Sequence, residues 1–143
     1  MPMLARWPGK IAAGSASDHI SAFWDVLPTF CEVASTSIPQ DIDGKSFLPT
    51  LLGETEQQVK HDYLYWEFYE VGGKQALRKD DWKLVKLNLR DADKAVETEL
   101  YLLSEDLGET RNIAGEHPEK VKELEALLQE AHTPFPGISL FKG

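Results

Sequence analysis

Cysteine is almost absent from this chain: Cys31 is the only one among 143 residues. A single cysteine excludes an internal disulfide framework and a metal site built from cysteines. Long hydrophobic runs are missing too, and none approaches the roughly 20 residues that a membrane-spanning helix needs. The sequence also lacks internal repeats and low-complexity tracts. The composition is that of a globular protein, because 42% hydrophobic residues are too many for a disordered chain.

Basic residues are scarce relative to acidic ones. The chain has 15 Lys and Arg against 24 Asp and Glu, which gives a formal net charge of −9. This balance argues against nucleic-acid binding, which depends on clustered basic side chains. A local anion site is still compatible with it, because a few cations can dominate a pocket. The length fits one domain or a piece of a larger one.

Residues 1–55 carry structural signals that have no partners. Residues 3–9 predict a strand that ends in a Pro-Gly turn. Asp25 is expected to begin a helix with one apolar face, formed by Val26, Leu27, Phe30, Cys31 and Ala34. A short helix is predicted over 46–52, ending at Gly53. On their own, the strand edge and the apolar helix face would be exposed, so this part is expected to be a piece of a larger sheet domain.

From Tyr63 onward the hydrophobic period changes to two, which is typical of strands. Leu64, Trp66 and Phe68 are expected on one face, and Tyr63, Tyr65, Glu67 and Tyr69 on the other. Gly72-Gly73 ends this strand, and residues 74–79 and 82–89 flank a turn in a hairpin. A further strand over 98–103 and an amphipathic helix over 117–132 follow. The predicted fold is α+β, with a small antiparallel sheet packed against a C-terminal helix.

Few side chains suggest catalytic chemistry. Cys31 lies on the apolar helix face without an adjacent histidine, so we expect a buried structural cysteine. The four histidines are too widely spaced to predict a metal site. Asp41 and Asp43 precede Gly44 and predict a turn, because a calcium-binding EF-hand loop needs more oxygen ligands. No phosphate-binding loop and no Gly-x-Ser-x-Gly motif is present.

One polar group stands out on the predicted strand pair after Tyr63. It consists of Glu67, Tyr69, Glu70, Lys74, Gln75, Arg78 and Lys83. Composition alone favours a half-buried sheet with a solvated polar face. The alternative is the rim of a pocket for a polar ligand, in which the glycine turn lets the ligand approach the backbone and the aromatic rings stack on a sugar or aryl ring.

Five segments follow one another in the order found in arylsulfatase-type sulfatases. They are "RWPGKIAAGSASDH", "DVLPTFCEVA", "IPQDIDGKSFLPTLLG", "YLYWEFYEVGGKQALRKDDWKLV" and "ELYLLSEDLGETRNIAGEHPEKV". The chain therefore resembles the C-terminal part of this family over nearly its whole length. The resemblance implies an enzyme similar to alkaline phosphatase, with a large α/β domain and a smaller C-terminal antiparallel sheet backed by a helix. Residues 1–55 would be the tail end of the large domain, and residues 56–143 the C-terminal α+β subdomain.

The resemblance also implies where the catalytic groups lie. Sulfatases use a formylglycine made from Cys or Ser in a short motif, together with a calcium ion that acts as a Lewis acid and template. Cys31 is followed by "EVAS" and not by that motif. No catalytic or metal-binding residue is therefore expected in this chain, and calcium and formylglycine are expected in the missing N-terminal part, which would be its partner.

For the substrate pocket, the resemblance implies that five residues lie near the leaving-group side: Glu67, Tyr69, Glu70, Lys74 and Gln75. Tyr69 departs from the family, because many relatives carry histidine there, which puts any role that needs an imidazole in doubt. Arg78 and Trp82 are equally compatible with structural roles.

The function implied is that of a C-terminal sulfatase fragment. The parent enzyme would hydrolyse sulfate esters of sugars or aryl alcohols, with this chain inactive alone and with neither nucleic acid nor membrane as partner. The alternative is a standalone, non-catalytic module that binds a glycan or a protein. Nothing in the sequence indicates a cellular location, although members of the resembled family are often periplasmic, secreted or lysosomal.

Overall fold

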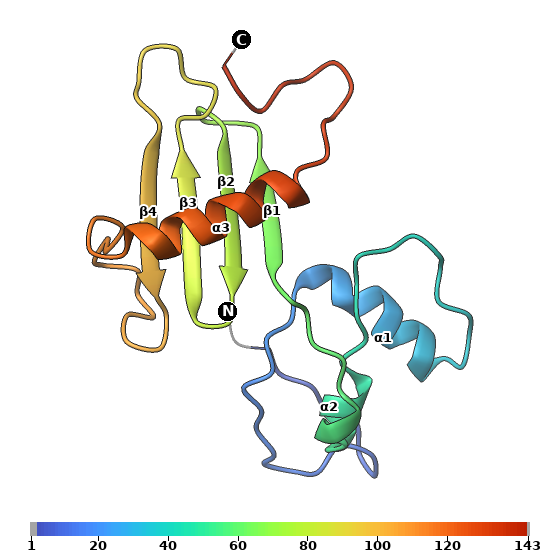
Figure 1. Ribbon diagram of the computed structural model, residues 1–143. Helices are drawn as coiled ribbons and strands as arrows, with labels where there is room; N and C mark the ends of the chain where they lie inside the picture. Colours follow the sequence, from blue (N-terminus) through green and yellow to red (C-terminus); the bar gives the residue numbers. More distant parts are fainter. Residues whose placement is uncertain (1–2, 143) are drawn as a thin grey trace. The chain divides into compact units, whose positions relative to one another are not determined.

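The computed structural model describes residues 3–142 and divides the chain into two compact units, Met1–His61 and Asp62–Gly143. The first unit holds short helices, and the second holds a sheet and the longest helix (Figure 1). The expected boundary between residues 55 and 56 concerns the domains of a longer protein, and it stays a prediction. No helix within residues 3–142 combines the length and apolar character needed to cross a membrane.

The first unit contains four short helical segments. They are η1 (Phe23–Asp25), α1 (Val26–Val33), α2 (Leu48–Leu52) and η2 (Thr55–Gln57). The predicted Pro-Gly turn forms, with the N–H groups of Lys10 and Ile11 donating to the Trp7 carbonyl at 3.0 and 2.9 Å. The strand predicted before it is wrong, because residues 3–6 are unpaired. Residues 3–61 contain no strand to which this segment could hydrogen-bond.

Helix α1 exposes the apolar face that the sequence predicts. Leu27 is 51% exposed and Phe30 64% exposed, and Phe23 just before the helix is 87% exposed. The buried side of the helix carries Pro28 and Thr29 instead. The expectation that this face lacks a partner within its own unit is confirmed. Cys31 is only half-buried, so a fully buried cysteine was the wrong expectation.

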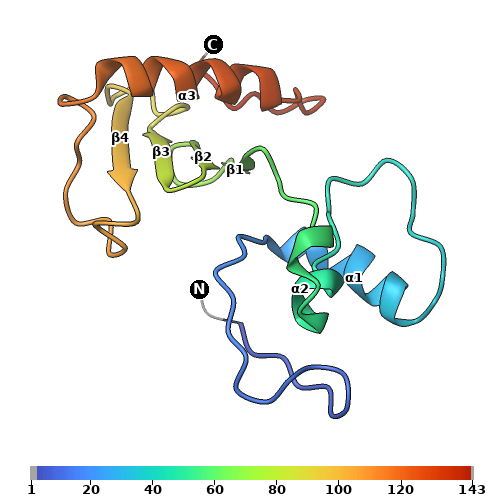
Figure 2. The same cartoon turned by 60° about the horizontal axis from the view of Figure 1, so that its bottom comes forward.

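The second unit contains a four-stranded antiparallel sheet with the strand order β1-β2-β3-β4. The strands are β1 (Leu64–Phe68), β2 (Lys74–Lys79), β3 (Trp82–Leu87) and β4 (Glu97–Leu102). Helix α3 (Pro118–Ala131) covers one face of the sheet, as Figure 2 shows. The predicted α+β arrangement is confirmed.

The core lies between this sheet face and α3. Leu77, Leu84 and Leu100 are side by side in the strand register, and Leu124 and Leu128 of α3 pack on them. Each such side chain contributes roughly 1.5–3 kcal/mol when buried. Tyr65 pairs with Leu77, so Tyr65 and Glu67 face α3. The alternate residues of β1, Leu64, Trp66 and Phe68, face the other way. The predicted alternation is confirmed.

An unusual turn connects β1 and β2. Val71, Gly72 and Gly73 have successive φ angles of 50°, 85° and 73°, all in the left-handed region. A Cβ atom on Gly73 would lie 2.7 Å from Cγ of Arg90, so this position requires glycine. Arg90 in turn donates from its backbone N–H to the Gly72 carbonyl at 2.7 Å and from Nη1 to the Tyr69 carbonyl at 2.8 Å. The turn is thereby held against the segment that follows β3.

Candidate functional site

The carboxylate of Glu67 is the centre of a half-buried polar network on the α3 side of the sheet. Its Oε1 accepts hydrogen bonds from the Tyr65 hydroxyl and from Nδ1 of His132, which follows α3. Its Oε2 accepts from the Tyr69 hydroxyl at 2.7 Å. The side chains of Glu67 and His132 are 13% and 17% exposed. The network ties β1 to the end of α3.

Hydrogen bonding keeps Glu67 ionised despite its burial. Burial alone would raise the pKa of Glu67, but the bonds from Tyr65, His132 and Tyr69 together lower this pKa below its ordinary value. Burial, and then the bond to Glu67, raise the pKa of Tyr65. Because a carboxylate can only accept, the hydrogen of the bond to His132 resides on Nδ1. The carboxylate therefore fixes the tautomer and orientation of the imidazole.

Three of the five predicted site residues belong to this network. Gln75, only 4% exposed, donates from Nε2 to the Tyr65 hydroxyl at 2.7 Å, which connects it to Glu67 and Tyr69. The sequence analysis missed two members, Tyr65 and His132. The position of Tyr65 on the same strand face as Glu67 was a usable signal. No local signal indicated His132, which is 65 residues away in sequence.

The other two predicted residues lie apart from the network. Lys74 pairs with Phe68 in the register, on the sheet face opposite α3, and Glu70 is exposed in the turn. Neither side chain has a hydrogen bond or ion pair with any residue in 3–142. The five residues therefore do not form one continuous surface. Whether any of them contacts substrate remains a prediction.

Arg78 and Trp82 make structural contacts. The Nε of Arg78 donates to the Asp80 carbonyl at 3.0 Å, in the turn between β2 and β3. The ring of Trp82 meets His117 edge-on, with ring centroids 5.3 Å apart. Lys120 Nζ lies 5.7 Å from the centroid of the Trp82 ring, within the range of a cation–π interaction.

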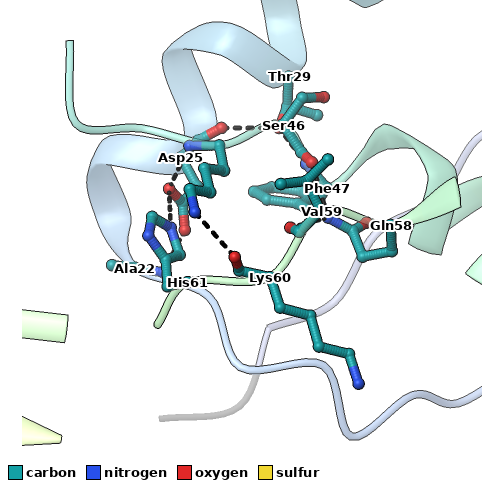
Figure 3. A network of polar contacts seen from close by, with 10 residues as sticks. Ala22, Asp25, Thr29, Ser46, Phe47, Gln58, Val59, Lys60 and His61 are labelled. Atoms are coloured by element: carbon teal, nitrogen blue, oxygen red, sulfur yellow. Dashed lines mark hydrogen bonds and ion pairs between the residues drawn. The ribbon is translucent and has the colours of Figure 1, made fainter. Parts of the chain in front are cut away.

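A second carboxylate organises the first unit (Figure 3). Asp25 is fully buried and accepts from the N–H groups of Ala22 at 2.7 Å and Lys45 at 2.8 Å, while His61 Nε2 lies 2.8 Å from its Oδ1. The Thr29 hydroxyl donates to the Asp25 carbonyl at 2.6 Å. All these partners belong to the protein, so Asp25 joins three segments of the unit and serves as a structural anchor.

The residues present do not match a calcium site. Within residues 3–142, no three side chains of the types His, Cys, Asp or Glu come together in an arrangement that could hold a metal ion. The location of calcium and formylglycine in an N-terminal part of the parent stays a prediction.

Comparisons with known proteins identify the architecture. The chain is 35% identical over 146 residues to the N-acetylglucosamine-6-O-sulfatase of Bacteroides thetaiotaomicron, covering 94% of this chain and 25% of that protein. It is 31% identical to arylsulfatase K of Xenopus laevis, covering 97% of this chain and 27% of the relative. A protein solved in complex with its substrate D-glucosamine-2-N,6-O-disulfate superposes with a TM-score of 0.69 at 33% identity, covering 87% of this chain and 26% of the other.

The sheet, the helix and these similarities define the C-terminal domain of a sulfatase. Residues 1–133 match the family described as "N-sulphoglucosamine sulphohydrolase, C-terminal". The chain belongs to this family. It spans about a quarter of the length of the relatives given above, 25% and 27% respectively.

Proposed function

We propose that this chain is the C-terminal part of a sulfatase that hydrolyses sulfate esters of sugars. The supporting observation is its 35% identity, over 94% of the chain, to an N-acetylglucosamine-6-O-sulfatase. A substrate with an aryl leaving group is the other possibility within the same reaction class, since arylsulfatase K is also similar. The parent's nucleophile and calcium ligands would come from the N-terminal part, and this chain supplies no residue to them.

The role proposed for this chain is to form part of the substrate-pocket rim through the turn after β1. Tyr69 is held from two sides, by Glu67 at its hydroxyl and by Arg90 at its carbonyl. A side chain fixed in this way loses little further conformational freedom when a ligand binds. Glu70 follows directly and is exposed, so it is available to a sugar hydroxyl. In this proposal Glu67 and Gln75 position the rim, and Tyr69 and Glu70 contact the substrate. Lys74, on the sheet face opposite α3, would reach the substrate from the other side of the turn.

The exposed face of α1 supports a partner outside the chain. Phe23, Leu27 and Phe30 are each more than half exposed and recur at the spacing of one helical face. Contiguous exposed apolar side chains mark an interaction surface. In the proposed parent this surface packs against the large α/β domain. A standalone binding module would be expected to cover it, so the alternative function is less well supported.

Activity measurements on two proteins test the proposal. The 143-residue chain alone is expected to release no sulfate from N-acetylglucosamine 6-sulfate or from an aryl sulfate, while the parent enzyme hydrolyses at least one of them. In the parent, Tyr69→Phe is expected to raise KM about tenfold, the size of one lost hydrogen bond. The matched control is Tyr63→Phe, which removes the hydroxyl of a tyrosine outside the Glu67 network and should leave KM unchanged. Turnover by the isolated chain, or a parent without sulfatase activity, would contradict the proposal.

A further inference from the structure

The tail that follows α3 forms a closed loop. The ring of His132 at its start meets the ring of Phe141 near its end edge-on, with centroids 5.1 Å apart. Leu140 is 1% exposed, and the Lys142 N–H donates to the Leu89 carbonyl at 2.9 Å. Figure 1 shows this segment leaving α3 and curling back toward the sheet. A loop of this length with its ends in contact is an Ω-loop, a type of element that is frequently functional.

This loop borders an open pocket of about 420 Å³. Its lining comes from His132, Pro134, Phe135, Gly137, Ile138, Ser139 and Leu140. Phe135 and Ile138 are 61% and 45% exposed, so the pocket offers an aromatic ring and an aliphatic side chain to solvent. The volume lies within the range of small-molecule sites.

The imidazole of His132 lines this pocket, and its orientation is fixed by Glu67. Its Nδ1 is bound to Glu67, and its Nε2 has no hydrogen-bond partner within residues 3–142. Because Nδ1 holds a hydrogen, the neutral imidazole presents a lone pair at Nε2 and accepts from a hydroxyl. The Ser139 hydroxyl is already engaged with the backbone of Phe141, donating at 3.0 Å and accepting at 3.2 Å. His132 is therefore the main polar anchor available to a ligand.

The charges around the pocket disfavour an anion. Of the lining residues within 3–142, none is a lysine or an arginine. Any positive charge on His132 is balanced by the carboxylate of Glu67 beside it. A sulfate group would thus enter without a cationic partner, which is costly in a partly enclosed site. An uncharged ring with hydroxyl groups on its edge and C–H groups on its face matches what Phe135 and His132 offer.

We propose that this tail pocket binds an unsulfated pyranose ring of a glycan, with the ring stacked on Phe135 and one hydroxyl donating to Nε2 of His132. The inference rests on the proposed function for its ligand class, and it adds a binding site for a neighbouring sugar that does not carry the reacting sulfate.

NMR titration of the isotope-labelled 143-residue chain tests this site. N-acetylglucosamine is expected to shift the backbone amides of residues 132–141 with a Kd of about 1–10 mM, typical of one weakly held ring. N-acetylglucosamine 6-sulfate should bind about threefold more weakly, because its charge approaches Glu67. Phe135→Ser should weaken binding about three- to tenfold. The matched control is Phe30→Ser, which changes a phenylalanine of similar exposure, 64% against 61%, and should leave the Kd unchanged.

A variant of His132 separates binding from structure. In His132→Asn the amide N–H can replace Nδ1 toward Glu67 while Nε2 is removed. The ring contact with Phe141 is lost as well, so the spectrum should change only around Phe141 and stay native elsewhere, and affinity should fall. The site is overturned by an absence of shifts in residues 132–141 up to about 50 mM sugar. It is also overturned by equal binding of the sulfated sugar, or by undiminished affinity in Phe135→Ser. If the tail pocket binds the sugar but the parent has no sulfatase activity, only the proposed function fails. If the parent is active but the tail pocket binds no sugar, only this inference fails.

Discussion

At the scale of single residues, two carboxylates organise the protein, one in each unit. Asp25 is fully buried among backbone N–H groups and His61, and Glu67 is bound by two tyrosines and His132. Each collects partners from distant parts of its unit, so each has a larger structural effect than a surface ion pair. Because the partners differ, the two carboxylates lead to different expectations.

Removing the Asp25 carboxylate should destabilise the first unit. Asp25→Asn exchanges an acceptor for an amide that cannot satisfy both N–H groups and His61, and we expect a loss of about 3 kcal/mol of unfolding free energy. Hydrogen exchange read by mass spectrometry would show faster exchange of the Ala22 and Lys45 amides. Asp43→Asn, at an exposed position nearby, should leave exchange unchanged. Retained protection in Asp25→Asn would show that the backbone contacts suffice without the charge.

Glu67 should make the second unit sensitive to acid. Its pKa is lowered in the folded protein, so ionised Glu67 stabilises the fold at pH values above its ordinary pKa of 4.5. This contribution is lost as the pH falls from about 4.5 through the folded pKa, because the unfolded chain then binds the proton more strongly. Denaturant midpoints measured between pH 7 and pH 3 should fall less steeply in Glu67→Gln than in the wild type.

A matched variant isolates this effect from other acids. Glu123 also makes stability fall with acid below pH 4.5, since Lys120 and Lys79 lower its pKa from the ordinary value of 4.5 to about 2 in the folded protein. Glu70→Gln removes an exposed carboxylate without hydrogen bonds to residues 3–142 and should follow the wild-type curve. Equal slopes for the wild type and Glu67→Gln would show that the network contributes no acid sensitivity.

At the scale of elements, local patterns predicted most of the second unit. The period of two over residues 63–69, the Asp80-Asp81 turn and the apolar stripe of α3 are each decided by neighbours in sequence, and all three are confirmed. The strand predicted near residue 4 failed, because a strand depends on a partner that no local pattern supplies. The Glu67–His132 bond was missed for the same reason, since it joins residues 65 apart.

The turn between β1 and β2 gives a paired prediction. Gly72 and Gly73 both have positive φ, but only at Gly73 would a Cβ atom collide, 2.7 Å from Arg90 Cγ; at Gly72 the nearest atom is 3.5 Å away. Gly72→Ala should cost about 1 kcal/mol from backbone strain alone. Gly73→Ala should cost about 2–3 kcal/mol, because strain and overpacking combine. Denaturant unfolding measures both, and equal losses would mean that Arg90 moves aside freely.

At the scale of the whole molecule, the two units differ in how well they bury their apolar residues. The second unit has a continuous core of leucines between its sheet and α3. The first unit exposes the α1 face that includes Phe23, Leu27 and Phe30. The isolated chain should therefore behave as one well-folded unit joined to one weakly protected unit.

Limited proteolysis with mass spectrometry checks this difference. Residues 1–55 should be cleaved first, while a core that begins near Tyr63 survives, because the open forms of the first unit are more populated. The zinc protease thermolysin suits the test, since it cuts beside exposed apolar side chains. Resistance of the whole chain would instead favour the standalone module.

The exposed face of α1 should also drive self-association. Phe30→Ser removes an apolar side chain that contributes little to the core, so it should lower the associated fraction in sedimentation velocity without lowering stability. Leu107→Ser provides the comparison, because Leu107 is 82% exposed in the other unit. It should leave association unchanged. An equal effect of both substitutions would indicate non-specific hydrophobic association rather than association through the α1 face.

The closed tail has a consequence for synthesis on the ribosome. The partners of Glu67 and Leu89 are His132 and Lys142, which are translated long after the strands that they secure. Domains fold as units during translation, at roughly 5–20 residues per second. The nascent second unit therefore holds its four strands, which end at Leu102, with the Glu67 carboxylate lacking its imidazole partner until residues 132–142 emerge. A premature stop codon just before His132 would leave that intermediate permanently open and a ready substrate for cellular quality control.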